Sequence, residues 1–128
     1  MARQKSAQPT PVELQILGTL WDHGPQTARQ IHERLQSEKP SAYSTTVTML
    51  SVMLEKKLVG RDDTAQPQVY RAARSRSVTQ RKLLQDLAQR AFDGSLMSLV
   101  MQALSTHRAT ADEVQEMRQI LDSMESKS

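Results

Sequence analysis

Three amphipathic helices are predicted within the first 57 residues from the spacing of apolar positions. The segment Thr10-Pro11-Val12-Glu13 opens the first helix, because it combines a capping threonine, a proline at the first helical position and a glutamate three residues after the cap. A second capping pattern at residues 27–30 starts a helix over 27–36. After a turn at residues 37–41, a third helix is predicted over 42–57.

The period of the pattern changes after the third helix. Residues 58–61 and 68–72 are short β-like segments, and the polar stretch 62–67 between them favours a hairpin. Three helices followed by a hairpin is the order of a winged helix-turn-helix. In that fold, residues 27–36 form the first helix of the motif, residues 42–57 form the recognition helix and residues 58–72 form the wing.

Residues beyond 76 are predicted to be helical almost throughout. Ser77-Val78-Thr79-Gln80 is typical of a capping box at the start of a long helix. Asp93-Gly94-Ser95 separates that helix from an apolar one at 95–105, and Thr110 caps the last helix. The expected fold class is mainly α with a small β-hairpin, in which a winged helix-turn-helix precedes three further helices.

The C-terminal helices carry more apolar surface than they would cover among themselves. The helix at 95–105 is apolar nearly all round, and a second copy of the chain is the commonest way to cover such a surface. We therefore predict a homodimerisation region, although folding back onto the N-terminal part is an alternative. The predicted dimerisation residues are Phe92, Leu96, Met97, Leu99, Val100, Met101, Leu104, Val114, Met117 and Leu121.

Charge is distributed unevenly along the 128 residues, which carry a net charge of +3. Residues 1–76 have eleven basic and seven acidic side chains, net +4, whereas residues 77–128 have six and seven, net −1. This division favours a polyanion-facing N-terminal module, with a solvated surface of slight bias as the alternative. We expect a disordered arm at 1–9, a winged-helix domain at 10–76 and a helical domain at 77–128.

The sequence contains few patterns that indicate catalysis or metal binding. Cysteine is absent, which excludes disulfides, thiolate metal sites and a cysteine nucleophile. Gly-rich phosphate loops, His-Glu-x-x-His and Gly-x-Ser-x-Gly do not occur, and Asp62-Asp63 fits a turn better than a cation site. We expect no enzyme, no cofactor and no metal site. The polar N-terminus and the lack of a long apolar run predict a soluble, cytoplasmic protein without membrane insertion.

The predicted recognition helix has one apolar and one hydroxyl-rich face. At about 100° per residue, the core-facing stripe comprises Tyr43, Thr46, Val47, Leu50, Met53 and Leu54. The opposite row, with its flanking positions, comprises Ser41, Ser44, Thr45, Thr48, Met49 and Val52. Short hydroxyls on such a face would hydrogen-bond bases or phosphates. The outward valine would contact a thymine methyl group, or is an incidental surface residue.

Basic residues cluster around this helix and the hairpin. Their positions suit neutralisation of backbone phosphates, and they are Lys56, Lys57, Arg61, Arg71, Arg74 and Arg76. We predict that double-stranded DNA is bound through the outer face of the helix at 42–57 together with Lys56, Arg61 and Arg71.

Several segments resemble the penicillinase repressor family (BlaI/MecI type). Residues 42–50 and 55–59 resemble its recognition-helix segment, and Leu20-Trp21, Tyr70-Arg71 and residues 92–96 add similar features in the same order. The resemblance covers roughly residues 10–124. It implies a homodimeric winged-helix repressor that binds palindromic operators through its N-terminal domain. Carried over by position, it places Thr45 and Thr48 in the groove and makes Thr46, Leu50 and Met53 buried.

The chain also departs from the family pattern at informative positions. Val52 and Lys57 stand where the family often has arginine and glycine, so the operator preference and the turn into the hairpin are expected to differ. Gln102-Ala103 stands in place of the Asn-Phe pair that is cleaved in the antibiotic-responsive branch, and the copper-binding cysteines of another branch are absent. The alternative function is a winged-helix protein-interaction module that binds a partner through its C-terminal helices.

Overall fold

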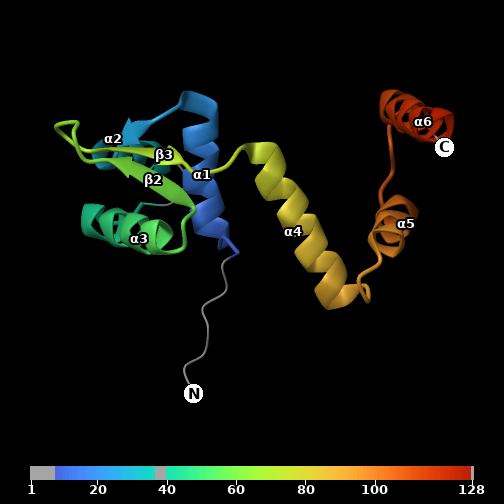
Figure 1. The fold of residues 1–128 in the computed structure, drawn as a ribbon, viewed down its shortest axis with the longest axis horizontal. Coiled ribbons are helices and arrows are strands. Elements are labelled where there is room, and N and C mark those ends of the chain that lie inside the picture. The colour runs from blue at the N-terminus through green and yellow to red at the C-terminus, as the bar shows by residue number, and fades with distance from the viewer. Residues whose placement is uncertain (1–7, 37–39, 128) are drawn as a thin grey trace, which may run out of the picture. The chain divides into compact units, whose positions relative to one another are not determined.

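The computed structural model describes residues 8–36 and 40–127 (Figure 1). Most of the predicted arm, at 1–7, and the middle of the predicted turn, at 37–39, lie outside the described residues. The chain forms two compact units, Met1–Leu83 and Leu84–Ser128. No helix in the described part is long and apolar enough to cross a membrane.

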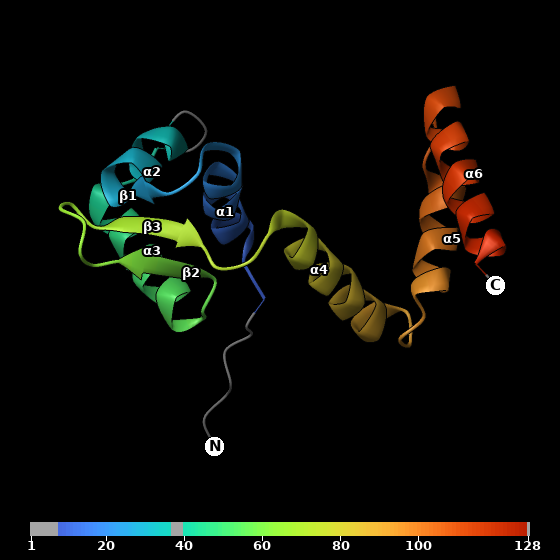
Figure 2. The same cartoon turned by 45° about the horizontal axis from the view of Figure 1, so that its top comes forward.

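The first unit is a winged helix-turn-helix, as predicted. β3 lies between β1 and β2 in an antiparallel sheet (Figure 2). The two-residue β1, in which Gln26 pairs with Tyr70, was not predicted, because so short a strand has no alternating pattern. In chain order, the elements are α1 (Pro11–His23), β1 (Gln26–Thr27), α2 (Ala28–Leu35), α3 (Tyr43–Glu55), β2 (Val59–Asp62) and β3 (Val69–Ala72).

The helix starts follow local capping chemistry. Thr10 accepts a hydrogen bond from the Glu13 N–H, and the Glu13 carboxylate accepts one from the Thr10 N–H; Thr27 caps α2 in the same way. The predicted end of α3 at residue 57 was two residues too late. The helix ends at Glu55, since Lys57 adopts a φ of 63°, a left-handed conformation that an α-helix does not contain.

The core of the first unit joins one face of each helix to the sheet. Thr46, Leu50 and Met53 are buried as predicted, and Val47 and Leu54 are half-buried. Tyr43 was wrongly placed in the core stripe, because this residue is 37% exposed in the first turn of α3. The buried apolar residues are Ile16, Leu17, Leu20, Ile31, Leu35, Leu50, Met53, Leu58, Val59 and Tyr70.

The second unit contains the end of α4 (Arg76–Ala91) together with α5 (Leu96–Thr106) and α6 (Ala111–Ser126). The capping box predicted at residue 77 is wrong: α4 begins at Arg76, and the Ser75 hydroxyl accepts the Val78 N–H at 3.2 Å. Ser95 caps α5 and Thr110 caps α6 as predicted. Among residues 84–127, Ala88 alone is buried.

Candidate nucleic-acid interface

The solvent-facing side of α3 is rich in hydroxyl groups. Ser44, Thr45, Thr48 and Ser51 are all exposed, and Glu55 closes the row at the end of the helix. Ser51 was missed in the sequence, because the predicted row was rotated toward the other edge of the helix. Ser41 is exposed just before the helix, where its N–H donates to the Gln36 side chain.

Two residues predicted for this face are half-buried, whereas its other members are exposed. Met49 is half-buried and packs against the core, beside Leu35 and Thr45 in a small apolar pocket. Val52 is likewise half-buried. The exposed part of α3 is therefore more polar than the sequence suggested, and its short side chains suit close approach to a groove.

Lys56 forms a buried ion pair with Glu13. Its ammonium lies 2.8 Å from the carboxylate, and the two side chains are 13% and 5% exposed. Burial alone would raise the pKa of Glu13, but the hydrogen bonds from Lys56 and Thr10 outweigh it and hold that pKa below its usual value. The charge of Lys56 is neutralised at this site. The structure therefore favours a role of Lys56 in attaching the end of α3 to α1, and not a contact with phosphate.

The wing carries balanced charge. Arg61 donates to the Asp63 carboxylate, and its hydrogen bonds to Tyr70 and Asp63 raise its pKa. Asp62 accepts from the Thr64 hydroxyl and N–H, which lowers the pKa of Asp62. Through these contacts Asp62 and Asp63 form part of the turn, as the sequence suggested. They also leave Arg61 less available for phosphate than predicted.

Arg71 lies across the neighbouring strand at Gly60. A Cβ placed on Gly60 would be 2.8 Å from the central carbon of the Arg71 guanidinium, so a larger residue at position 60 would displace the end of this side chain. Arg71 is exposed and, within the described residues, forms no ion pair. It is the wing cation best placed to meet a polyanion.

Arg29 of α2 was missed by the sequence analysis. Its guanidinium carbon lies 4.4 Å from the centre of the Tyr43 ring, while the His32 ring meets Tyr43 edge-on at 5.4 Å. Arg29 and Tyr43 line an open groove together with Gln68, which directly precedes β3. This places a cation beside the start of α3, where the N-cap residue supplies no side-chain hydrogen bond. Since Arg29 and Tyr43 are 14 positions apart, no local motif predicts the contact.

The other predicted basic residues divide into two groups. Arg76 pairs with Asp22 at 2.6 Å, and its hydrogen bond and charge lower the pKa of Asp22. Lys57 and Arg74 are exposed and, within the described residues, form no ion pair. Of the basic residues named for this interface, Arg29, Lys57, Arg71 and Arg74 therefore stay available for phosphates.

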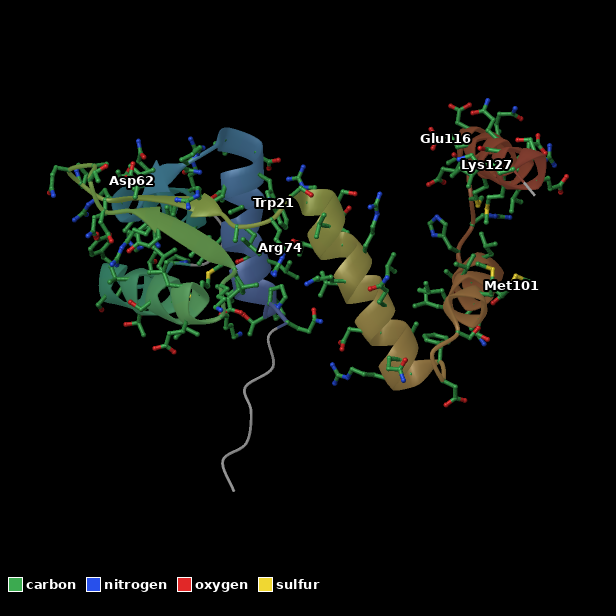
Figure 3. The ribbon with its side chains drawn as sticks, viewed as in Figure 1. Trp21, Asp62, Arg74, Met101, Glu116 and Lys127 are labelled. Carbon is green, nitrogen blue, oxygen red and sulfur yellow. The ribbon has the colours of Figure 1, made fainter. Side chains whose placement is uncertain are left out.

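The second unit exposes a large apolar surface on α5 and α6. The structure describes both helices in full, and neither contains a buried residue. Met101, labelled on α5 in Figure 3, is 65% exposed, and Ile120, which the sequence analysis missed, is 60% exposed. Leu96, Met97, Val100, Leu104 and Leu121 are also exposed, and Phe92, Leu99, Val114 and Met117 are half-buried.

Comparison with known proteins identifies relatives along nearly the whole chain. Residues 9–123 match the penicillinase repressor family. Similar proteins include the transcriptional regulators BlaI of two Mycobacterium tuberculosis strains, CDC 1551 / Oshkosh and ATCC 25618 / H37Rv. Each is 33% identical over 119 residues, which cover 90% of this chain and 83% of the relative.

Proposed function

Since the chain belongs to the penicillinase repressor family and is a DNA-binding transcriptional repressor, we propose that it binds a palindromic operator as a homodimer. Residues 10–76 act as the DNA-binding domain and residues 77–128 as the dimerisation domain. The observation that carries the homodimer is the uncovered apolar surface of α5 and α6.

The exposure of this surface is energetically unfavourable in a monomer. Five apolar side chains of α5 and three of α6 are between 40% and 65% exposed. Burying apolar surface contributes about 25 cal/mol per Å², so covering these side chains supplies a strong driving force for association. In a two-fold dimer the same surface of each copy covers the other.

The DNA contacts follow from the hydroxyl-rich face of α3. Ser44, Thr45, Thr48 and Ser51 face the base edges in the major groove, and Arg29 and Arg71 meet phosphates on either side. A dimer presents two such helices to successive major grooves, about 34 Å apart. Occupancy of a promoter by this dimer blocks access of the polymerase.

The double variant Thr45→Asp/Thr48→Asp tests this assignment, because it places two negative charges on the groove-facing side. We expect loss of sequence-specific binding with an unchanged sedimentation coefficient. The matched control is Gln80→Asp/Gln85→Asp, which adds the same charge to exposed positions of α4 and should bind within about threefold of the wild type, because distant surface charges change binding little. Specific binding that survives the first double substitution would show that this face is wrongly assigned.

A further inference from the structure

The last turn of α1 is attached to the chain segment that enters α4. The indole Nε1 of Trp21 donates a hydrogen bond to the carbonyl of Arg74 at 2.9 Å, and Figure 3 shows the two residues between α1 and the start of α4. Trp21 is half-buried and also packs against the core. Its contact therefore links the core to a segment beyond β3, 53 positions later in the chain.

The first residue of α4 makes the second attachment. Arg76 donates a hydrogen bond to the Asp22 carboxylate at 2.6 Å, and its guanidinium carbon lies 5.4 Å from the centre of the Trp21 ring. Ser75 caps the same helix. We call Trp21, Asp22, Arg74 and Arg76 the α1–α4 latch.

The α1–α4 latch joins α1 to α4 and not to the hydroxyl-rich face of α3, and Arg74 takes part in it through its backbone carbonyl. The charge of Arg76 is neutralised by Asp22, and the contacts that define the latch involve neither α3 nor the wing strands. The latch acts instead on α4, a 16-residue helix that begins in the first unit and ends in the second. Such a helix is about 24 Å long, so a small change in the direction of its first turn displaces its far end by several ångströms.

We propose that the α1–α4 latch is the positioning device that sets the half-site spacing accepted by the dimer. This inference rests on the proposed homodimeric, operator-binding function. Two linked DNA-binding domains gain affinity from simultaneous binding only where their separation matches that of the half-sites. By holding the first turn of α4 to α1, the latch restricts the direction in which α4 leaves the DNA-binding domain. When the latch is loosened, each domain can still bind a half-site. The gain in affinity from binding both half-sites at once becomes smaller.

The double variant Trp21→Phe/Arg76→Gln tests the proposal while keeping an aromatic ring in the core. The DNA probe is the tightest duplex that the wild-type protein selects from a randomised library, with versions 2 bp longer or shorter between the half-sites and a version with one half-site scrambled. We expect unchanged binding to the single half-site and an unchanged dimer. The affinity for the selected duplex should fall roughly tenfold, and the three spacings should be bound within about threefold of one another.

A merely structural role of the α1–α4 latch gives a different pattern. Equal losses on the single half-site and on the full duplex, or a retained spacing preference, would overturn the proposal. The matched control is Arg90→Gln, which breaks an ion pair with Asp86 within α4 and touches no residue of α1. It should keep the spacing preference. A wild-type protein that selects no palindrome refutes the proposed function itself, so the two failures are distinguishable.

Discussion

Replacing Glu13 by glutamine removes the charge that faces Lys56 and keeps an oxygen that can accept the Thr10 N–H. The ammonium of Lys56 is then left without its partner at a site where its side chain is 13% exposed. Breaking a fully buried pair by removing one partner costs about 3–5 kcal/mol. Because Lys56 keeps some contact with solvent, we expect Glu13→Gln to cost about 2–3 kcal/mol of unfolding free energy.

The double variant Glu13→Gln/Lys56→Met separates the ion pair from other effects. Neither charge remains in this variant, so its loss of unfolding free energy should be about 1 kcal/mol or less. This is well below the sum of the losses in the two single variants. Urea unfolding of the full chain at pH 7 and one fixed protein concentration measures all four proteins. Single variants that each cost under about 0.5 kcal/mol, or effects that simply add, would show that the charges of Glu13 and Lys56 do not stabilise each other.

The difference in unfolding free energy between the wild type and Glu13→Gln should depend on pH with a defined sign. The pKa of Glu13 is lowered in the folded protein, so its contribution to stability is present above the ordinary carboxyl pKa and is lost as the pH falls through the folded value. The gap between wild type and Glu13→Gln should therefore stay constant from neutral pH to about 5 and close under more acidic conditions. A gap that widens on acidification would contradict this assignment.

The remaining predictions concern one turn, one cation and the apolar surface. Lys57→Gly should stabilise the chain by about 0.5–1 kcal/mol in urea unfolding, because glycine adopts the φ of 63° without strain; Lys57→Ala should give no such gain. Arg29→Ala should reduce the slope of log affinity against log salt by about 1 per protomer on specific and nonspecific DNA alike, and an unchanged slope would remove Arg29 from the interface. Met101→Glu should shift the protein to monomers in sedimentation, because it places a charge in the apolar surface; a persistent dimer would argue against this interface.

The elements that were predictable depend on neighbours in the sequence. Each of the capping boxes at Thr10, Thr27 and Thr110 joins a residue to one three positions later. These contacts can therefore be predicted without knowledge of the rest of the fold. The hairpin and the buried positions of α3 followed from the period of apolar residues.

The features that were not predictable depend on contacts between distant residues. The sequence marks Lys56 as a surface cation, and only the packing of α3 on α1 brings it to Glu13, 43 positions away. The contact of Arg29 with Tyr43 likewise forms only after α2 and α3 have packed. The exposed row on α3 was close to its predicted position but rotated, since the burial of Met49 depends on neighbouring helices.

Binding of the purified protein to DNA shows whether it recognises a specific sequence. Fluorescence anisotropy at about 150 mM salt would compare a duplex from the region upstream of its own coding sequence with a scrambled duplex of equal length and composition. If the protein is a sequence-specific homodimeric repressor that regulates its own promoter, its affinity for the upstream duplex should exceed that for the scrambled duplex by about a thousandfold or more. Equal, weak binding to both duplexes, repeated with duplexes selected from a random library, would contradict the account and favour a module that binds another protein through α5 and α6.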